Sequence, residues 1–288
     1  MEKLLVLLVA FFVSFNSPVP APRTITMCHG TATPPDDMAL LASTNAFQML
    51  HEEPLTFHFT SKAGGEMISF KATDGTQAKG FFIKAKQPTD KYLLVYQEWW
   101  GLNDHIKQEA EKYYNALDGR VNVLAPDLYD GKVTDKREEA GKLIGEAMAN
   151  AAHLEAIVKG AFAYAGPKAK FGSVGWCFGG MWSLRSAILA GKQADACVMY
   201  YGTPVKDVEQ LKKLETDVLG IFGSQDTGIP PTVVEEFEKN MKTAGEKVTI
   251  KMYDAVHAFA NPSNPKFNKA FAEEAFALSS GYLKKKLL

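Results

Sequence analysis

The segment 175–179, Gly-Trp-Cys-Phe-Gly, follows an apolar run and places a thiol between two glycines. It has the G-x-S-x-G form of a strained strand-to-helix turn that exposes a nucleophile, with Cys177 in place of serine. The glycines are needed because such a turn leaves no room for side chains beside the nucleophile. The start of the following helix favours a thiolate, and the backbone N–H of Phe178 points to where an oxyanion would form. The pattern therefore predicts Cys177 as a nucleophile and Phe178 as an oxyanion-hole donor.

Two further side chains can complete this chemistry, an acid and a base. Asp226 follows one apolar run, and His257 follows the last one, at 248–252. A neutral imidazole can take the thiol proton and later activate water if a carboxylate holds its other ring nitrogen. The three residues occur in the order nucleophile, acid, histidine, which is the order found in folds that carry this kind of turn. We predict a triad of Cys177, His257 and Asp226, with Asp207, in a similar loop, as the rival acid.

The remaining histidines precede the core or fall in helical stretches, and we predict that they are structural or solvent-exposed. They are His29, His51, His58, His105 and His153. Cys197 lies inside an apolar run and is predicted to be a buried packing residue. Because no close-spaced Cys/His pair is present, a zinc site built on the predicted triad is not expected. The proposed chemistry requires no cofactor.

These side chains need a scaffold, and the apolar pattern indicates which one. From residue 92 on, short apolar runs alternate with longer helical stretches, which is typical of buried parallel strands with crossover helices. The predicted strands are 92–97, 121–125, 171–175, 196–201, 218–222 and 248–252, and the predicted helices are 105–117, 136–165, 179–189, 231–244 and 266–285. Three shorter runs, at 56–61, 67–72 and 80–85, are predicted to form an antiparallel entry to the sheet. Together with the strained turn, this indicates the α/β-hydrolase fold, a doubly wound, mostly parallel sheet with its site beyond the carboxyl ends of the strands.

The composition is that of one globular domain. The chain has 288 residues, of which 46% are hydrophobic and 23% charged, and we see no internal repeat or linker. We expect one catalytic domain at 54–288, behind a surface leader at 22–53 that holds one short helix. A formal net charge of -1, from 32 Lys+Arg and 33 Asp+Glu, offers nothing that would attract a polyanion. A nucleic-acid partner is therefore not expected, and we expect a monomer or weak oligomer.

The first 21 residues are predicted to be a signal peptide. Lys3 precedes an apolar run at 4–15, and the stretch 16–21 is rich in Pro and small residues. An apolar run of this length is too short for a stable membrane anchor, so we expect an exported protein, periplasmic or secreted. The alternative is a lipid anchor at Cys28. The mature chain would keep three cysteines, an odd number, so at least one thiol stays free.

Five motifs together resemble the dienelactone hydrolase family, over a match from about residue 80 to residue 283. They are Gln-Glu-Trp-Trp-Gly-Leu-Asn at 97–103, Ala-Pro-Asp-Leu-Tyr at 125–129, Gly-Trp-Cys-Phe-Gly-Gly at 175–180, Gly-Ser-Gln-Asp at 223–226 and His-Ala-Phe at 257–259. The resemblance implies a Cys-His-Asp triad at Cys177, His257 and Asp226. It also implies hydrolysis of a small ester or lactone through a thioester acyl-enzyme.

The resemblance implies roles for the residues that follow the first two parallel strands. In the family, the glutamate at the position of Glu98 contacts the resting thiol and helps to form the thiolate once substrate arrives. The backbone N–H of Trp99 would be the second oxyanion donor. Trp100 and Tyr129 are expected to line an apolar substrate pocket, although packing in the aromatic core is an alternative account of both.

One departure from the family concerns the substrate. Family members that act on dienelactone resemble this chain near Tyr129 and His257 but carry an arginine shortly after each, which holds the substrate carboxylate. Neither arginine is present here, and Lys132 is the nearest cation that could bind substrate. A flexible ammonium cannot reproduce a bidentate guanidinium clamp. We therefore do not expect dienelactone to be the natural substrate.

A hypothesis from another class is a non-catalytic or redox-sensing thiol protein on a hydrolase scaffold. Export to an oxidising compartment would be compatible with it. A sensor thiol usually has a resolving cysteine nearby, and none lies close to Cys177 in the sequence. We therefore favour the hydrolase.

Overall fold

The structure is a computed structural model that describes residues 37–261, 263–264 and 267–288, which belong to a single compact unit. The predicted signal peptide and Cys28 lie outside the described residues. Within the described part of the chain, no helix is long and apolar enough to cross a membrane.

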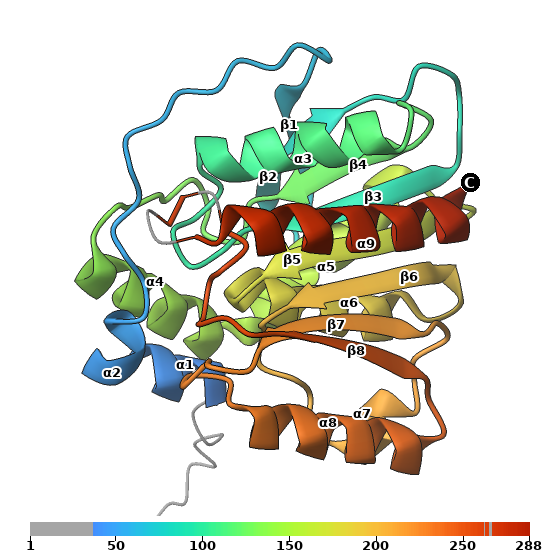
Figure 1. Ribbon diagram of the computed structural model, residues 1–288. Helices are drawn as coiled ribbons and strands as arrows, with labels where there is room; N and C mark the ends of the chain where they lie inside the picture. The colour runs from blue at the N-terminus through green and yellow to red at the C-terminus, as the bar shows by residue number, and fades with distance from the viewer. Residues whose placement is uncertain (1–36, 262, 265–266) are drawn as a thin grey trace, which may run out of the picture. The chain divides into compact units, whose positions relative to one another are not determined.

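The core is an eight-stranded sheet with the strand order β1-β2-β4-β3-β5-β6-β7-β8 (Figure 1). The strands are β1 Glu66–Lys71, β2 Gln77–Ile83, β3 Lys91–Tyr96, β4 Asn122–Pro126, β5 Lys170–Trp176, β6 Ala194–Tyr200, β7 Val218–Gly223 and β8 Val248–Tyr253. The pairs β1–β2 and β2–β4 are antiparallel, and every other neighbouring pair is parallel. The predicted fold class, a mostly parallel sheet with an antiparallel entry, is confirmed.

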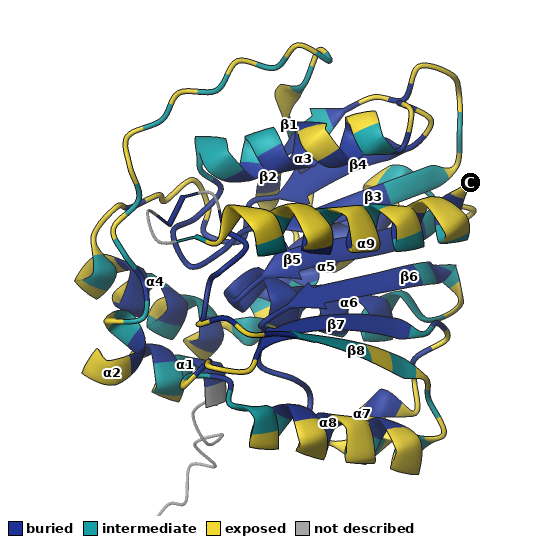
Figure 2. Cartoon of the chain, viewed as in Figure 1, coloured by how far each residue is buried: buried dark blue, intermediate teal, exposed yellow. Residues whose placement is uncertain are grey.

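Helices cover both faces of the sheet. They are α1 Asp37–Ala42, α2 Asn45–Gln48, α3 Asp104–Ala116, α4 Arg137–Ala149, α5 Ala151–Ala165, α6 Phe178–Ala190, the 3₁₀ turn η1 Gly191–Gln193, α7 Val208–Leu211, α8 Pro231–Ala244 and α9 Lys269–Leu287. Helices α3 and α9 lie on one face, and α5 and α6 on the other (Figure 1). Figure 2 shows the central strands buried between helices whose outer faces are exposed. Strands β4 and β7 are buried along their whole length. Strands covered by helices on both faces of a sheet need such predominantly apolar sequences.

Two predicted elements differ from the structure. The helix predicted at 136–165 is two helices, because the chain leaves helical geometry at Asn150, with φ -118° and ψ 46°. The strand predicted at 56–61 is an irregular extended segment. Its polar groups bond side chains of α3 instead of a neighbouring strand: the backbone N–H of Phe59 donates to Asp104 at 3.0 Å, and that of Lys62 to Glu111 at 3.1 Å. A β-rich composition cannot form a strand when its edge has no partner.

The leader segment, residues 37–53, is more deeply packed than a surface leader would be. It forms two short helices, and α1 packs against α4 (Figure 1). Met38, Ala42 and Phe47 are buried in the main core. The described part of the leader is therefore an integral part of the compact unit that holds the sheet.

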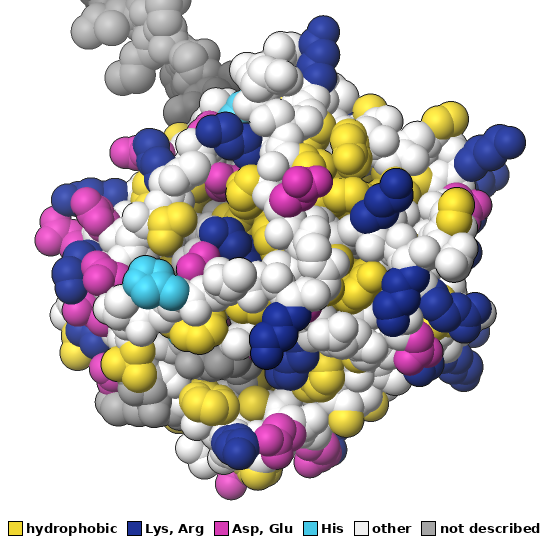
Figure 3. Space-filling model, turned by 90° about the horizontal axis from the view of Figure 1, so that it is seen from above, with side chains coloured by type: hydrophobic (Ala, Val, Ile, Leu, Met, Phe, Trp, Pro, Cys, Tyr) yellow, Lys and Arg dark blue, Asp and Glu magenta, His cyan; other side chains and the backbone are white. Residues whose placement is uncertain are grey.

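The surface carries charges of both signs. On the face seen in Figure 3, Lys and Arg side chains are interspersed with Asp and Glu side chains. Exposed ion pairs also form along helices elsewhere in the described structure, such as Lys142 with Glu138 and Lys159 with Glu155. Exposed pairs of this kind contribute little to stability and mainly keep the surface polar.

Candidate active site

Cys177 lies at the sharp junction between β5 and α6, where the chain has the strained geometry that the motif predicts. Its φ of 53° and ψ of -114° are unusual for a residue with a side chain. A Cβ atom on Gly175 would overlap the carbonyl oxygen of Gly179, and one on Gly179 would overlap the carbonyl oxygens of Tyr96 and Gln97. Strain at such a position costs about 1–3 kcal/mol and is kept mainly at functional sites.

Asp226 and His257 form a buried pair at the ends of the neighbouring strands β7 and β8. The Nδ1 atom of His257 lies 2.6 Å from Oδ2 of Asp226. The other oxygen of Asp226 accepts hydrogen bonds from the N–H groups of Gly228 at 2.8 Å and Ile229 at 2.9 Å. Burial would raise the pKa of Asp226, but the charge and hydrogen bond of His257 and these two N–H groups lower it below its usual value. The carboxylate is therefore ionised and fixes the tautomer of the imidazole, with the proton on Nδ1.

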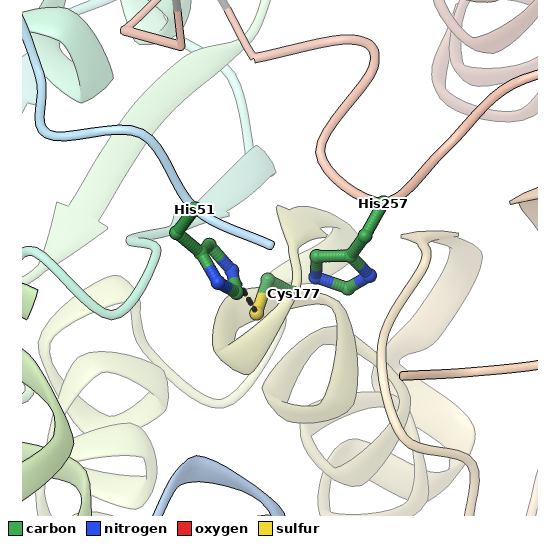
Figure 4. Close-up of side chains that lie close together, drawn as sticks. All are labelled: His51, Cys177 and His257. Atoms are coloured by element: carbon green, nitrogen blue, oxygen red, sulfur yellow. Dashed lines mark hydrogen bonds between the residues drawn. The ribbon is translucent and has the colours of Figure 1, made fainter. Parts of the chain in front are cut away.

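His257 and Cys177 lie close together, as the predicted triad requires. Figure 4 shows one edge of the His257 imidazole facing Cys177. Within the described residues, the Nε2 atom of His257 is buried and has no hydrogen-bond partner. Because Nδ1 carries the proton toward Asp226, Nε2 presents a lone pair that can accept the thiol proton.

A second imidazole also lies beside the thiol. The Nε2 atom of His51, at the end of the leader segment, lies 3.7 Å from Sγ of Cys177 (Figure 4). The sequence predicts that His51 is structural or solvent-exposed; it is buried and beside the thiol, so solvent exposure is wrong, and the sequence did not place it at the site. The sequence carried little signal for it, because 126 residues separate the two side chains. The one local cue is Phe47, four residues earlier, which anchors the same short segment in the core.

The protonation state of His51 follows from its partners. Its Nδ1 lies 3.0 Å from the carbonyl oxygen of Phe47, which can only accept, so Nδ1 carries the proton and Nε2 a lone pair. Burial lowers the pKa of His51 well below its usual value, and the neighbouring His257 lowers it further. His51 is therefore a neutral imidazole that accepts a hydrogen bond from the Cys177 thiol.

The resting thiol of Cys177 is protonated. The sequence led us to expect a thiolate, because the start of a helix favours a negative charge. Burial raises the pKa of Cys177 well above its usual value, and the carboxyl groups of Glu98 and Asp226 raise it further. The backbone N–H of Phe178 lowers this pKa but does not outweigh the other effects. The low dielectric of a buried site and its two carboxyl groups thus dominate over the helix dipole. Formation of the thiolate needs a base at the moment of reaction.

Glu98 lies in the same buried environment, just after β3. Burial raises its pKa to about 8, so at neutral pH the carboxyl group is mostly protonated. Its Oε2 accepts a hydrogen bond from the side chain of Asn261, which sequence reasoning did not single out. Its Oε1 is buried without a partner among the described residues. Glu98 therefore has one oxygen free to exchange a proton within the site.

Aromatic side chains enclose the thiol. The ring centroid of His51 lies 4.2 Å from that of Trp99, and Phe47 lies 5.3 Å from His257. Cys177 itself is only 1% exposed. The leader segment thus places one imidazole against the thiol and one apolar ring against His257.

The other predicted site residues fall at different depths. Trp100 is buried and lies against Trp99, with ring centroids 4.8 Å apart, and Tyr129 is buried against Phe178 at 5.3 Å. Lys132 is on the surface, where its Nζ pairs with Glu146 at 2.9 Å. Trp100 and Tyr129 thus lie in buried aromatic packing, the alternative account of both, and their role in a substrate pocket stays a prediction.

The rival acid, Asp207, is exposed and caps the short helix α7. Its Oδ1 accepts the backbone N–H of Glu209 at 2.8 Å, and its Oδ2 lies 3.2 Å from the side-chain nitrogen of Gln210. Both oxygens serve the local turn. Asp226, in contrast, is the acid that bonds His257.

The chain matches the model of the dienelactone hydrolase family over residues 78–287. It belongs to that family. A relative from Aquifex pyrophilus named "Protein usf" is 28% identical over 235 residues, which cover 77% of this chain and 99% of the relative. A relative from Aquifex aeolicus named "Putative carboxymethylenebutenolidase" is 26% identical over 231 residues, which cover 76% of this chain and 98% of the relative.

Solved structures share the fold of this dienelactone hydrolase family member. A dienelactone hydrolase-like promiscuous phosphotriesterase from metagenomic libraries superposes with a TM-score of 0.66 at 20% identity, covering 77% of this chain and 98% of the other. The dienelactone hydrolase from Anabaena variabilis superposes with a TM-score of 0.58 at 19% identity, covering 79% of this chain and all of the other. The protein is a carboxylic ester hydrolase, and its substrate class is small-molecule esters.

Proposed function

We propose that the protein hydrolyses small esters or lactones through a thioester formed on Cys177, with His257 as base and Asp226 as its orienting acid. One observation supports this most strongly. The His257 ring faces a thiol held at a strained turn (Figure 4), and its Nε2 atom has no hydrogen-bond partner among the described residues, while Nδ1 lies 2.6 Å from Asp226. This is the geometric relationship that nucleophilic catalysis by a thiol needs.

The first half-reaction transfers the acyl group. His257 accepts the proton of the Cys177 thiol, and the sulfur attacks the carbonyl carbon of the ester. The oxyanion accepts hydrogen bonds from the backbone N–H groups of Phe178 and Trp99, each of which typically contributes about 2.7–4 kcal/mol to lowering the barrier. Collapse of the intermediate breaks the bond to the alkoxide, which leaves with the proton from His257.

The second half-reaction restores the thiol. His257 takes a proton from water, the hydroxide attacks the thioester, and the sulfur leaves and recovers its proton. No cofactor takes part in either step. Glu98 is mostly protonated at neutral pH because its pKa is about 8, and its Oε1 has no partner among the described residues. It is suited to donate a hydrogen bond to the thiolate while the thiolate forms and decays.

The redox-sensor alternative is less well supported. A sensor thiol is typically accessible and has a lowered pKa. Cys177 is buried, and its pKa is raised. Cys197, the other cysteine of the described residues, is also buried, and its Sγ lies 3.7 Å from the hydroxyl of Ser183.

We further propose that the protein acts outside the cytoplasm. The apolar run at 4–15 and the stretch of Pro and small residues at 16–21 support export. Mass spectrometry of protein from its native host tests this, with the loss of at least the first 15 residues or so as the expected result. A soluble cytoplasmic form that starts at Met1 or Glu2 would contradict it.

Acyl trapping tests the mechanism directly. Intact-protein mass spectrometry with a slow activated ester should show one acyl group on Cys177, and Cys177→Ala should abolish both the adduct and turnover. Cys197→Ala is the matched control: it removes the other buried thiol, so it should lower stability more than activity. Wild-type turnover by Cys177→Ala, or an acyl group on another residue, would refute the proposal.

A further inference from the structure

We propose that His51, Cys177 and His257 form a binding site for a borderline-soft divalent cation of the zinc type. One nitrogen of each imidazole and the Sγ atom all lie within 4.8 Å of one another, and the three residues are buried. Figure 4 shows the two rings on either side of the sulfur. The two histidines come from segments far apart in the chain, the leader segment and the loop after β8.

Both imidazoles present a lone pair to the site. Each ring uses Nδ1 as a hydrogen-bond donor, His51 to the carbonyl of Phe47 at 3.0 Å and His257 to Asp226 at 2.6 Å. Such outer bonds are what orient histidine ligands in metal sites, where the second nitrogen commonly donates to a carboxylate or a backbone carbonyl. The Nε2 atom of His257 is buried without a hydrogen-bond partner among the described residues. Coordination to an ion would give this lone pair a partner.

The spacing suits a tetrahedral ion. With Zn–S of about 2.3 Å and Zn–N of about 2.0–2.1 Å, tetrahedral angles place sulfur and nitrogen about 3.6 Å apart. The observed separation between Sγ of Cys177 and Nε2 of His51 is 3.7 Å. The longest separation in the group, at most 4.8 Å, requires a shift of about 1 Å, which side-chain torsions can supply.

The ligand types select the ion. One thiolate and two imidazoles favour zinc and other late first-row metals over magnesium or calcium, which prefer oxygen ligands. Three protein ligands leave a fourth position for water. The thiolate and the nearby Asp226 carboxylate would together balance the two positive charges of the ion.

Binding has a defined proton balance. The thiol S–H bond breaks, the metal–sulfur bond forms, and one proton leaves to solvent, while both imidazoles bind without losing a proton. The ion would engage both the sulfur and the lone pair of His257, so a protein with bound metal could not carry out the acyl transfer proposed above. This inhibitory consequence rests on the proposed function, whereas the binding itself does not.

The test is spectroscopic and uses no substrate. The purified, reduced and chelator-treated protein is titrated with Zn²⁺ against a chromophoric chelator, and with Co²⁺ to detect thiolate-to-cobalt charge transfer. We expect one equivalent of ion, a charge-transfer band, and the release of one proton, measured by calorimetry in buffers of different ionisation enthalpy.

Variants assign the ligands. His51→Gln should weaken Zn²⁺ binding by roughly 100-fold or more, because ligand loss exceeds the effect of losing an outer-shell partner. Cys177→Ser should abolish the charge-transfer band. If His51→Gln does not fold, Cys177→Ser alone tests whether the ion binds at this cluster. His105→Gln and Cys197→Ser, which alter a histidine and a thiol outside the cluster, should bind as wild type does.

Several outcomes would overturn the site: no charge transfer in the wild type, an unchanged band in Cys177→Ser, or unchanged affinity in His51→Gln. Ion binding without charge transfer would place the ion elsewhere on the protein and would also overturn it. The two proposals fail separately. Binding without esterase activity would refute only the proposed mechanism, and activity without the charge-transfer band would refute only the metal site.

Discussion

The Nε2 atom of His51 lies 3.7 Å from the Sγ atom of Cys177, so the end of the leader segment rests directly on the proposed nucleophile. Arg137, the first residue of α4, holds this end in place. Its guanidinium donates to the backbone carbonyl of His51 and pairs with Glu52 at 3.1 Å. The leader segment thus covers one side of the thiol.

We therefore predict that His51→Ala raises the rate at which iodoacetamide alkylates Cys177, by roughly tenfold or more, because it replaces the covering ring by a cavity. Arg137→Ala, which releases the end of the leader segment, should raise the rate less. Peptide mass spectrometry after timed alkylation measures both. His105→Ala is the control and should alkylate at the wild-type rate. Equal rates in all four proteins would show that the leader segment does not limit access.

The assignment of the acid leads to a second prediction. Asp226→Asn should lower kcat by several orders of magnitude, because an amide would allow the wrong imidazole tautomer. Asp207→Asn should leave kcat unchanged, since Asp207 caps an exposed turn. Ester hydrolysis by both variants, with thermal melts to verify folding, provides the comparison. The opposite ranking would mean that His257 is oriented by another group.

Much of this arrangement follows from local sequence patterns. The parallel strands are largely apolar runs because helices cover the sheet on both faces. They can be located from the pattern of apolar residues along the sequence. Cys177, Asp226 and His257 are recognisable because each follows such a run, and the carboxyl ends of parallel strands meet at one edge of the sheet. Gly175 and Gly179, beside Cys177, also have a local cause: neighbouring backbone approaches each of them too closely for a side chain.

The parts that the sequence did not predict depend on long-range contacts. His51 joins the site only because the leader segment packs against α4 and Arg137 fixes its end, and no periodic pattern encodes that docking. Asn261 bonds Glu98 across 163 residues. The protonation state of the Cys177 thiol also could not be predicted from the sequence. It depends on burial and on nearby carboxyl groups, whereas the sequence shows only that the thiol precedes a helix.

A third prediction concerns the substrate. Lys132 is exposed and pairs with Glu146, and neither family arginine is present, so a substrate carboxylate would lack the guanidinium clamp that the family uses. We expect neutral short-chain esters and lactones to be hydrolysed with a higher kcat/KM than dienelactone. Lys132→Ala should leave kcat/KM for neutral esters unchanged. A higher kcat/KM for dienelactone than for neutral esters would show that another cation performs this role.

The last prediction links pH, stability and activity at Glu98. A carboxyl group whose pKa is raised on folding holds more protons when folded than when unfolded, so its burial lowers stability as the pH rises between the two pKa values. For Glu98 these values are 4.5 and about 8. Glu98→Gln removes the ionisable group and keeps its shape. Its free energy of unfolding should therefore exceed that of the wild type by an amount that grows from about pH 5 to pH 8 and is then constant, on the order of a few kcal/mol.

The same variant should turn over esters at least tenfold more slowly, because an amide N–H is a much weaker hydrogen-bond donor to the forming thiolate than a carboxylic acid O–H. Urea unfolding at several pH values and initial rates of ester hydrolysis measure the two effects. Glu109→Gln is the matched control. Glu109 is also buried, and burial raises its pKa, although Lys112 opposes the shift. It lies on α3 with Lys112 as its partner, so its replacement should change the pH dependence of stability but leave the rate intact. If the stability difference between Glu98→Gln and the wild type grows with pH as expected but the variant keeps the wild-type rate, Glu98 is a structural residue and takes no part in forming the thiolate.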